Sequence, residues 1–187
     1  MLLIFDGYDC TGKTTLANYF SNKFALKIFK RSAVKCIEQE KVEDHRLWAK
    51  AQYIMLGRLV EQGQVPNIIF DRWMMSEYCY SPVVRGYDIK DYYFEVENLI
   101  KDSKDVLWVY LTVGEEENSE KILRKRYDDK KEDFLSFEDL LKVKKNFDEL
   151  FKVSKIPKLK ILTNVVPTQD LINEQLSLVW KTLSSHK

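Results

Sequence analysis

Short apolar runs alternate with longer amphipathic stretches along this chain. The runs have the length of buried strands, and the stretches between them repeat apolar residues at helical spacing. The predicted strands are 2–5, 26–29, 68–70, 106–111 and 159–162, and the predicted helices are 15–25, 43–62, 88–103, 137–151 and 168–183. Strands that alternate with helices are typical of a parallel sheet covered by helices. We therefore expect an α/β fold, a doubly wound, mostly parallel sheet of about five strands with helices on both faces.

The segment from Gly7 to Thr14 fits the pattern G-x-x-x-x-G-K-[ST] at every fixed position. It lies between a predicted strand and a predicted helix, which is the context that a phosphate-binding loop requires. Loop N–H groups and the helix N-terminus can bind phosphate oxygens, Lys13 adds a positive charge, and the Thr14 hydroxyl can ligate Mg²⁺. The residues expected to bind ATP are Gly7, Tyr8, Asp9, Cys10, Thr11, Gly12, Lys13, Thr14 and Thr15. The sequence therefore predicts binding of a nucleoside triphosphate with Mg²⁺.

Asp71 and Arg72 follow the predicted strand 68–70 directly. An apolar strand that ends in Asp is the usual partner of a phosphate-binding loop for its metal. We expect Asp71 to hold Mg²⁺ through water together with Thr14, and Arg72 to face the phosphates. The alternative is a surface ion pair.

Two further groups of cations are candidates for binding phosphate. Arg31 follows the predicted strand 26–29, where the carboxyl ends of parallel strands form ligand crevices, although a solvated basic turn is the alternative. The segment of about 115–134 is densely charged and includes Arg124 and Arg126. Such runs are usually solvated helix faces, but after the fourth strand we favour a mobile lid that closes over the phosphates.

The predicted helix 43–62 carries apolar residues on two adjoining stripes, which include Leu47 and Trp48 respectively. Gln52 is the polar member of the Trp48 stripe. Its amide can pair with the edge of a nucleobase, and Trp48 and Tyr53 could supply a stacking surface. The alternative is a glutamine at the edge of the core that bonds to backbone.

Composition narrows the class of protein and of ligand. The chain has 187 residues, with 30 Lys and Arg against 29 Asp and Glu, so it has no overall basic field for binding polymeric nucleic acid. Its 3 scattered cysteines favour a reducing compartment over a disulfide framework. The first predicted strand starts at residue 2 and no apolar run is long enough to span a membrane, so we expect a cytoplasmic protein. We expect residues 1–187 to form a single domain.

With these residues in place, the chain resembles the thymidylate kinase family of P-loop nucleotide kinases from the first strand to the last helix. The segments that carry the resemblance are Phe5-Asp6-Gly7-Tyr8-Asp9-Cys10-Thr11-Gly12-Lys13-Thr14-Thr15, Arg31, Asp71-Arg72-Trp73-x-x-Ser76-x-x-Cys79-Tyr80, Leu111-Thr112-Val113, Arg124-Lys125-Arg126 and Asp133-Phe134.

The resemblance implies roles on the acceptor side. Asp9 matches a residue that contacts the 3′-hydroxyl of the acceptor sugar and lies near the metal. Arg31 and Arg72 match arginines on the acceptor phosphate. Tyr80 matches a tyrosine that blocks a ribose 2′-hydroxyl.

The chain also departs from the family pattern. Cys10 stands where one branch has a P-loop arginine, so the resemblance to the other branch implies that Arg124 or Arg126 supplies the catalytic charge. Ser81 replaces the glutamine expected after the tyrosine, and residues 32–34 lack the usual glycine- and proline-containing turn. These last departures concern the acceptor base and not the reaction.

A second resemblance concerns the segment from Trp48 to Arg58, which is similar to the related deoxynucleoside kinases, where a glutamine reads the base. A nucleoside kinase needs a carboxylate base near the neutral 5′-hydroxyl, whereas a monophosphate arrives as a dianion and needs cations. The second predicted strand ends in Lys30-Arg31 with no acid nearby, which favours a monophosphate. Asp71 could serve as the base if the acceptor were a nucleoside.

The sequence therefore predicts a Mg²⁺-dependent transfer of phosphate from ATP to a deoxynucleoside monophosphate. The first candidate for the acceptor is dTMP, which would give dTDP as the product. The alternatives are a deoxynucleoside kinase, a nucleotide-binding regulatory module, and a kinase acting on nucleic acid. We expect small-molecule nucleotides as partners, no membrane, and no polymeric nucleic acid. A homodimer is left open.

Overall fold

The computed structural model describes residues 1–30, 41–64, 67–114, 119–130, 135–163 and 169–185. The strands are β1 (Leu2–Asp6), β2 (Lys27–Lys30), β3 (Ile68–Asp71), β4 (Val106–Thr112) and β5 (Lys158–Leu162). The helices are α1 (Lys13–Phe24), α2 (Val42–Glu61), α3 (Met74–Val84), α4 (Lys90–Ile100), α5 (Ser119–Lys130), α6 (Phe137–Val153) and α7 (Gln169–Ser185).

The strands form one parallel sheet in the order β2-β3-β1-β4-β5. The neighbours β1 and β4 lie at the centre, and the chain leaves them toward opposite edges of the sheet. Ligand crevices of doubly wound sheets form at the carboxyl ends of such strands. The fold therefore places the Gly7–Thr14 loop, which follows β1, at this crevice.

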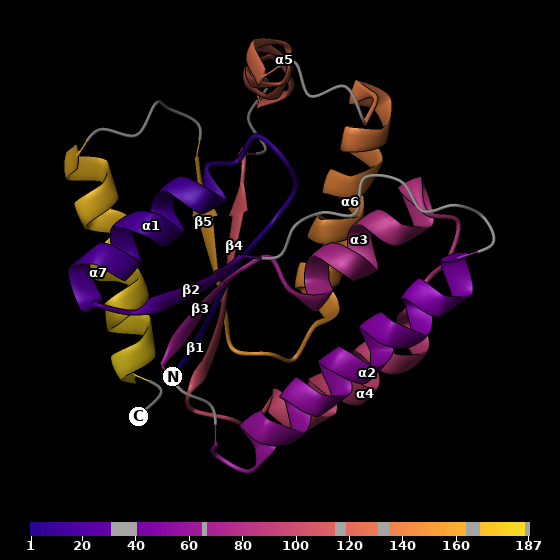
Figure 1. Ribbon diagram of the computed structural model, residues 1–187. Helices are drawn as coiled ribbons and strands as arrows, with labels where there is room; N and C mark the ends of the chain where they lie inside the picture. Colours follow the sequence, from indigo (N-terminus) through magenta and orange to yellow (C-terminus); the bar gives the residue numbers. More distant parts are fainter. Residues whose placement is uncertain (31–40, 65–66, 115–118, 131–134, 164–168, 186–187) are drawn as a thin grey trace.

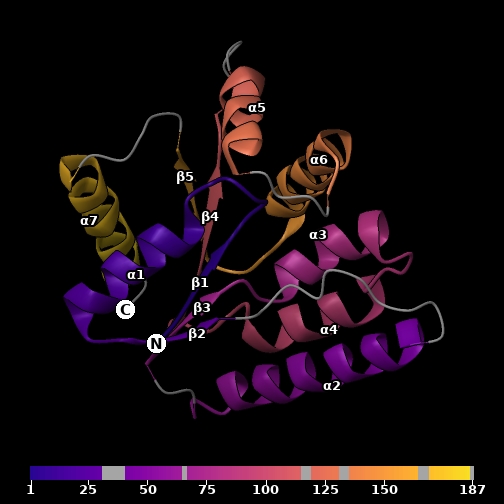
Figure 2. The same ribbon diagram turned by 45° about the horizontal axis from the view of Figure 1, so that its top comes forward.

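Helices cover both faces of the sheet, as the sequence predicts (Figure 1). Side chains alternate along β1, so that Leu3 and Phe5 pack in the core beneath α1 and α7, and Leu2 and Ile4 pack in the core on the side of α2, α3, α4 and α6. In both views α5 stands beyond the carboxyl end of β4 (Figure 2). The helix of the predicted lid therefore lies at the same end of the sheet as the Gly7–Thr14 loop.

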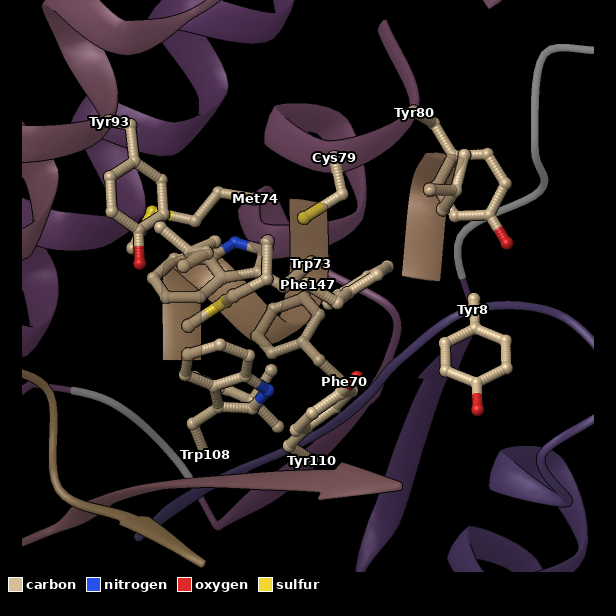
Figure 3. Close-up of a cluster of buried hydrophobic side chains, with 14 of the residues drawn as sticks. Tyr8, Phe70, Trp73, Met74, Cys79, Tyr80, Tyr93, Trp108, Tyr110 and Phe147 are labelled. Atoms are coloured by element: carbon tan, nitrogen blue, oxygen red, sulfur yellow. The ribbon is translucent and has the colours of Figure 1, made fainter. Parts of the chain in front are cut away.

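The larger core is rich in aromatic side chains (Figure 3). Trp73 and Trp108 are among its largest fully buried members. Tyr8 and Tyr80 lie at one edge of the cluster in this view, and both rings remain buried. The edge of this core therefore also forms part of the surroundings of the Gly7–Thr14 loop.

Helix α3 is an element that the sequence pattern does not reveal. Its buried side chains lie around much of the helix, so its apolar residues show little helical periodicity. Its N-terminus is capped by a carboxylate distant in sequence, because the backbone N–H groups of Trp73 and Ser76 each donate to Asp6 Oδ2 at 3.0 Å. Asp6 thereby joins the end of β1 to the start of α3.

The apolar stripes predicted for α2 are wrong, because Leu47 and Trp48 are 53% and 54% exposed. The buried face consists instead of Ala49, Tyr53, Gly57 and Val60. Helix α4 packs closely enough that a Cβ atom added at Gly57 would lie 3.0 Å from Leu99 Cδ1. Close helix packing selects small residues on the contact face, so hydrophobicity alone indicates the wrong side of α2.

In the parts of the chain that the structure describes, no helix is both long and apolar enough to cross a membrane.

Candidate active site

The Gly7–Thr14 loop connects β1 to α1, and its two glycines serve different purposes. Gly7 has φ +151°, and a Cβ atom there would lie 2.4 Å from the carbonyl oxygen of Leu111 on β4. Gly12 has φ +81° with nothing near its Cβ position, so it supplies only the left-handed conformation from which α1 starts. Gly7 is thus required by contact with β4, and Gly12 by backbone conformation.

This difference predicts unequal losses of stability. Gly12→Ala should lower the free energy of unfolding by about 1–2 kcal/mol, the usual penalty of a left-handed residue with a side chain. Gly7→Ala should lower it by clearly more, because backbone atoms of β4 must also move. Urea unfolding of both variants compares them, and equal losses would contradict the close contact between the loop and β4.

Tyr8 fixes the loop through both its side chain and its backbone. Its hydroxyl lies 3.0 Å from Thr112 Oγ1 and accepts a hydrogen bond from the Val113 N–H at 2.7 Å. Its carbonyl oxygen accepts from Thr11 Oγ1 at 2.9 Å and from Lys13 Nζ at 2.5 Å. The end of β4 therefore helps to position the lysine of the loop.

Lys13 is 5% exposed at the start of α1. Burial lowers the pKa of Lys13 to about 8, and the positive charge of Arg72 acts in the same direction. A buried ammonium with these surroundings gains most from an anion, which would replace the lost hydration. The loop is therefore arranged to accept negative charge at Lys13.

Thr14 and Asp71, the predicted metal ligands, lie together. Thr14 Oγ1 donates to Asp71 Oδ2 at 2.6 Å, while Asp71 Oδ1 is buried without a hydrogen-bond partner. The described residues contain no cluster of three or more His, Cys, Asp or Glu side chains suited to a metal. One carboxylate and one hydroxyl, completed by water and phosphate oxygens, fit Mg²⁺, which keeps much of its hydration in proteins. This pair could hold the metal.

Asp9, Arg72 and Tyr80, predicted for the acceptor side, form one cluster. Arg72 Nη2 donates to Asp9 Oδ1, Tyr80 donates to Asp9 Oδ2 at 2.8 Å, and the Arg72 guanidinium lies 5.4 Å from the centre of the Tyr80 ring. Burial acts to raise the pKa of Asp9, but the charges of Arg72 and Lys13 hold it below its ordinary value. Arg72 also has φ 76°, a conformation that is costly for a residue with a side chain. Because Asp9 belongs to the loop, this cluster borders the predicted site of ATP.

Asp6 is a residue of the site to which the sequence analysis assigns no role. It is fully buried and accepts hydrogen bonds from the Gly7 N–H at 2.8 Å and from Ser76 Oγ at 2.5 Å, besides capping α3. Burial raises its pKa, against the lowering effect of these donors. Asp6 links the loop to the segment that carries Arg72 and Tyr80. Its position directly before Gly7 of the motif is the sequence signal that could have identified it as a site residue.

The two lid arginines differ in their surroundings. Arg126 Nη1 donates to the carbonyl oxygen of Cys10 at 3.3 Å, so this side chain reaches the loop from α5. Arg124 is 52% exposed, with its guanidinium 4.4 Å from the centre of the Phe137 ring and its Nε 4.0 Å from Asp128. Arg126 is therefore the better placed of the two for contact with phosphate.

The residues predicted on α2 fit the site less well. Tyr53 is 2% exposed and packs against the rings of Trp73 and Tyr92, so the expected stacking surface at Tyr53 is a wrong prediction. Trp48 lies on the exposed face of α2, and Gln52 is half-buried. Among the described contacts, neither residue touches the Asp9–Arg72–Tyr80 cluster. Arg31 and the lid segments 115–118 and 131–134 lie outside the described residues.

Comparisons with known proteins give similarity in structure but not in sequence. No family model matches the chain, and no curated protein matches it significantly. The YorR protein of Bacillus subtilis, solved in complex with phosphorylated GDP, is 20% identical with a TM-score of 0.70, covering 100% of this chain and 99% of that one. Deoxyadenosine kinase from M. mycoides with bound dATP is 19% identical with a TM-score of 0.62, covering 98% of each chain. Thymidylate kinase from Candida albicans is 19% identical with a TM-score of 0.56, covering 100% of this chain and 93% of that one.

These likenesses show the fold. The chain has the architecture of P-loop nucleoside and nucleotide kinases, and its predicted likeness to thymidylate and deoxynucleoside kinases is confirmed at that level. Identities near 20% leave the acceptor to be argued from the site.

Proposed function

We propose that this protein transfers the γ-phosphoryl group of ATP to a deoxynucleoside monophosphate, with dTMP as the first candidate and dTDP as its product. One observation carries the proposal. Asp9 of the phosphate-binding loop contacts both Arg72 and Tyr80, so an acceptor bound at that cluster would lie directly beside the donor phosphates. A module that only sensed ATP would have no use for this second cluster.

The expected chemistry is positioning and neutralisation of charge, as in other phosphoryl transfers. Lys13 binds the donor phosphates, and Arg72 lies between donor and acceptor phosphates. Thr14 and Asp71 would hold Mg²⁺, which would neutralise charge on the phosphate oxygens. Arg126 contributes positive charge from the lid helix.

The state of the carboxylates supports a monophosphate acceptor. Asp6 caps α3, Asp71 bonds to Thr14, and Asp9 is paired with Arg72 and has a lowered pKa. A nucleoside acceptor needs a carboxylate that is ready to take a proton from its 5′-hydroxyl. A monophosphate needs cations instead, which Arg72 and the predicted Arg31 would supply.

The likeness in fold to deoxyadenosine kinase supports a second candidate, the phosphorylation of a deoxynucleoside. In that case Gln52 would read the base, and Asp9 or Asp71 would act as the general base. The engaged state of both carboxylates makes this the weaker candidate.

Transfer of labelled phosphate tests the proposed function. The native protein, incubated with Mg²⁺ and γ-labelled ATP, should move the label to dTMP and leave it there as dTDP. Release of labelled inorganic phosphate alone, with every monophosphate and nucleoside offered, would overturn the kinase assignment.

Tyr80 provides a prediction about the acceptor sugar. If its buried ring lies against C2′, Tyr80→Ala should admit a 2′-hydroxyl and reduce the preference for deoxynucleotide over ribonucleotide by about tenfold. Tyr80→Phe is the matched control, because it removes the hydrogen bond to Asp9 and keeps the ring. Comparison of kcat/KM for dUMP and UMP measures the preference. If Tyr80→Ala and Tyr80→Phe showed the same preference, the ring of Tyr80 would have no role in selecting the sugar.

A further inference from the structure

Arg126 is held between two segments that are far apart in the sequence. Besides the Cys10 carbonyl, its Nη1 donates to Thr163 Oγ1 at 3.2 Å, and its Nη2 donates to the Thr163 carbonyl oxygen. Thr163 directly follows β5. The guanidinium from α5 thus bridges the phosphate-binding loop and the end of β5.

Thr163 is itself fixed to the sheet. Its backbone N–H donates to the carbonyl oxygen of Thr112 at 2.9 Å, and its hydroxyl lies 3.3 Å from the same oxygen. Thr112 is the last residue of β4, and its hydroxyl contacts Tyr8 of the loop. The loop, β4, β5 and Arg126 are therefore connected in one closed series of hydrogen bonds.

This arrangement bears on the residue at position 10. The side chain of Cys10 carries no positive charge. Its backbone is left-handed (φ 66°), and its carbonyl oxygen accepts a hydrogen bond from Arg126. A guanidinium holds its five N–H donors in one rigid plane, so hydrogen bonds to neutral anchors fix the orientation of the whole charged group. A long side chain on a lid helix has many rotamers, and a fixed anchor removes most of them before the reaction.

We propose that Thr163 is a positioning residue that holds Arg126 over the phosphate-binding loop, so that the lid supplies the positive charge that Cys10 does not. The proposal rests on the proposed phosphoryl transfer and adds to it a residue outside the known motifs. Thr163 does not touch the phosphates; it acts through Arg126.

The test is a set of conservative variants. Thr163→Val removes the hydroxyl and keeps the shape and the carbonyl, so kcat should fall about tenfold to a hundredfold, the usual effect of losing a hydrogen bond to a charged group. The KM values for ATP and acceptor should stay within about twofold, because Arg126 acts in the transition state. Thr163→Ser should restore kcat. Thr182→Val on α7, whose hydroxyl donates to the Leu178 carbonyl within the helix, is the matched control and should leave kcat unchanged.

A double-mutant cycle separates positioning from a general structural role. Thr163→Val should have no further effect on kcat in an Arg126→Ala background, because there is then no guanidinium to position. An equal loss in both backgrounds, or native kcat in Thr163→Val, would overturn the proposal while leaving the kinase assignment intact.

The same cycle can be measured without any acceptor. ADP with Mg²⁺ and aluminium fluoride imitates the transferring phosphoryl group, and its affinity should fall in Thr163→Val and in Arg126→Ala but not further in the double variant. If no acceptor were phosphorylated, this affinity cycle would still decide the role of Thr163. Additive losses of affinity would reject it.

Discussion

Replacing Lys13 with methionine should lower turnover by about three orders of magnitude and leave the protein folded. The expected loss is large because the ammonium lies inside the loop, held by the Tyr8 carbonyl at the N-terminus of α1, where a donor phosphate would meet it. Methionine keeps the length of the side chain and removes the charge. Initial rates of ADP release measure the effect, with Lys23→Met, an exposed lysine near the end of α1, as the control.

The Lys13 variant should also be more stable than the native protein at pH 7. The pKa of Lys13 is about 8 in the folded protein, below its ordinary value of 10.5, so the buried charge lowers stability below pH 8. As the pH rises from 8 to 10.5 the folded protein gives up this proton before the unfolded chain does, and the penalty disappears. The Tm advantage of Lys13→Met should therefore shrink from pH 7 to pH 10. An inactive variant with a lower Tm at pH 7 would indicate damage to the fold and contradict this account of Lys13.

Arg126→Ala should lower kcat by about 10³- to 10⁵-fold, the range of arginine residues that stabilise phosphoryl transfer. Arg124→Ala should lower kcat only a few-fold, because Arg124 lies against Phe137 and Asp128 and not at the loop. The two residues share one helix, so the pair controls for effects on the helix itself. Steady-state rates with saturating ATP and acceptor measure the difference.

Arg126→Lys sharpens the comparison. Lysine keeps the positive charge but cannot contact the Cys10 carbonyl and Thr163 at once through a planar group, so most of the loss should persist. Equal rates for Arg124→Ala and Arg126→Ala would indicate that the charged helix is only a solvated face and that another group supplies the catalytic charge.

The parts of the fold that the sequence predicts are those with local signals. The strand of residues 2–5, the G-x-x-x-x-G-K-[ST] pattern and the helix after it are contiguous, and each reports on its neighbour. The strand 68–70 and its terminal Asp71 are equally local. Helix α3 has no such signal, since its apolar residues lie nearly all round and its cap, Asp6, is distant in sequence.

The prediction of which face of α2 is buried fails for a related reason. Burial there is decided by the close approach of α4 at Gly57, and a glycine contributes nothing to a hydrophobic stripe. Large apolar residues such as Trp48 and Met55 are left on the exposed side. Tyr53, which the sequence analysis interprets as a stacking surface, belongs to the buried face of α2, so that interpretation is wrong as well.

The residues of the site also divide into those that the sequence predicts and those that it does not. Lys13, Thr14 and Asp71 follow from motif spacing and from strands that end at one edge of the sheet. Asp6, Tyr8 and Thr163 also bond to Ser76, Val113 and Arg126, which are 37 to 105 residues away in the sequence, and the motif does not indicate these distant partners. These distant contacts, and not the motif itself, determine where the motif side chains lie.

The most direct test of the central claim is the choice between a monophosphate and a nucleoside as acceptor. Initial rates with Mg²⁺ and ATP should be measured side by side for thymidine, dTMP, deoxycytidine, dCMP and UMP. The account predicts that each monophosphate is phosphorylated far faster than its nucleoside, with dTMP ahead of UMP. Nucleosides that react faster than their monophosphates would contradict it and favour the deoxynucleoside kinase.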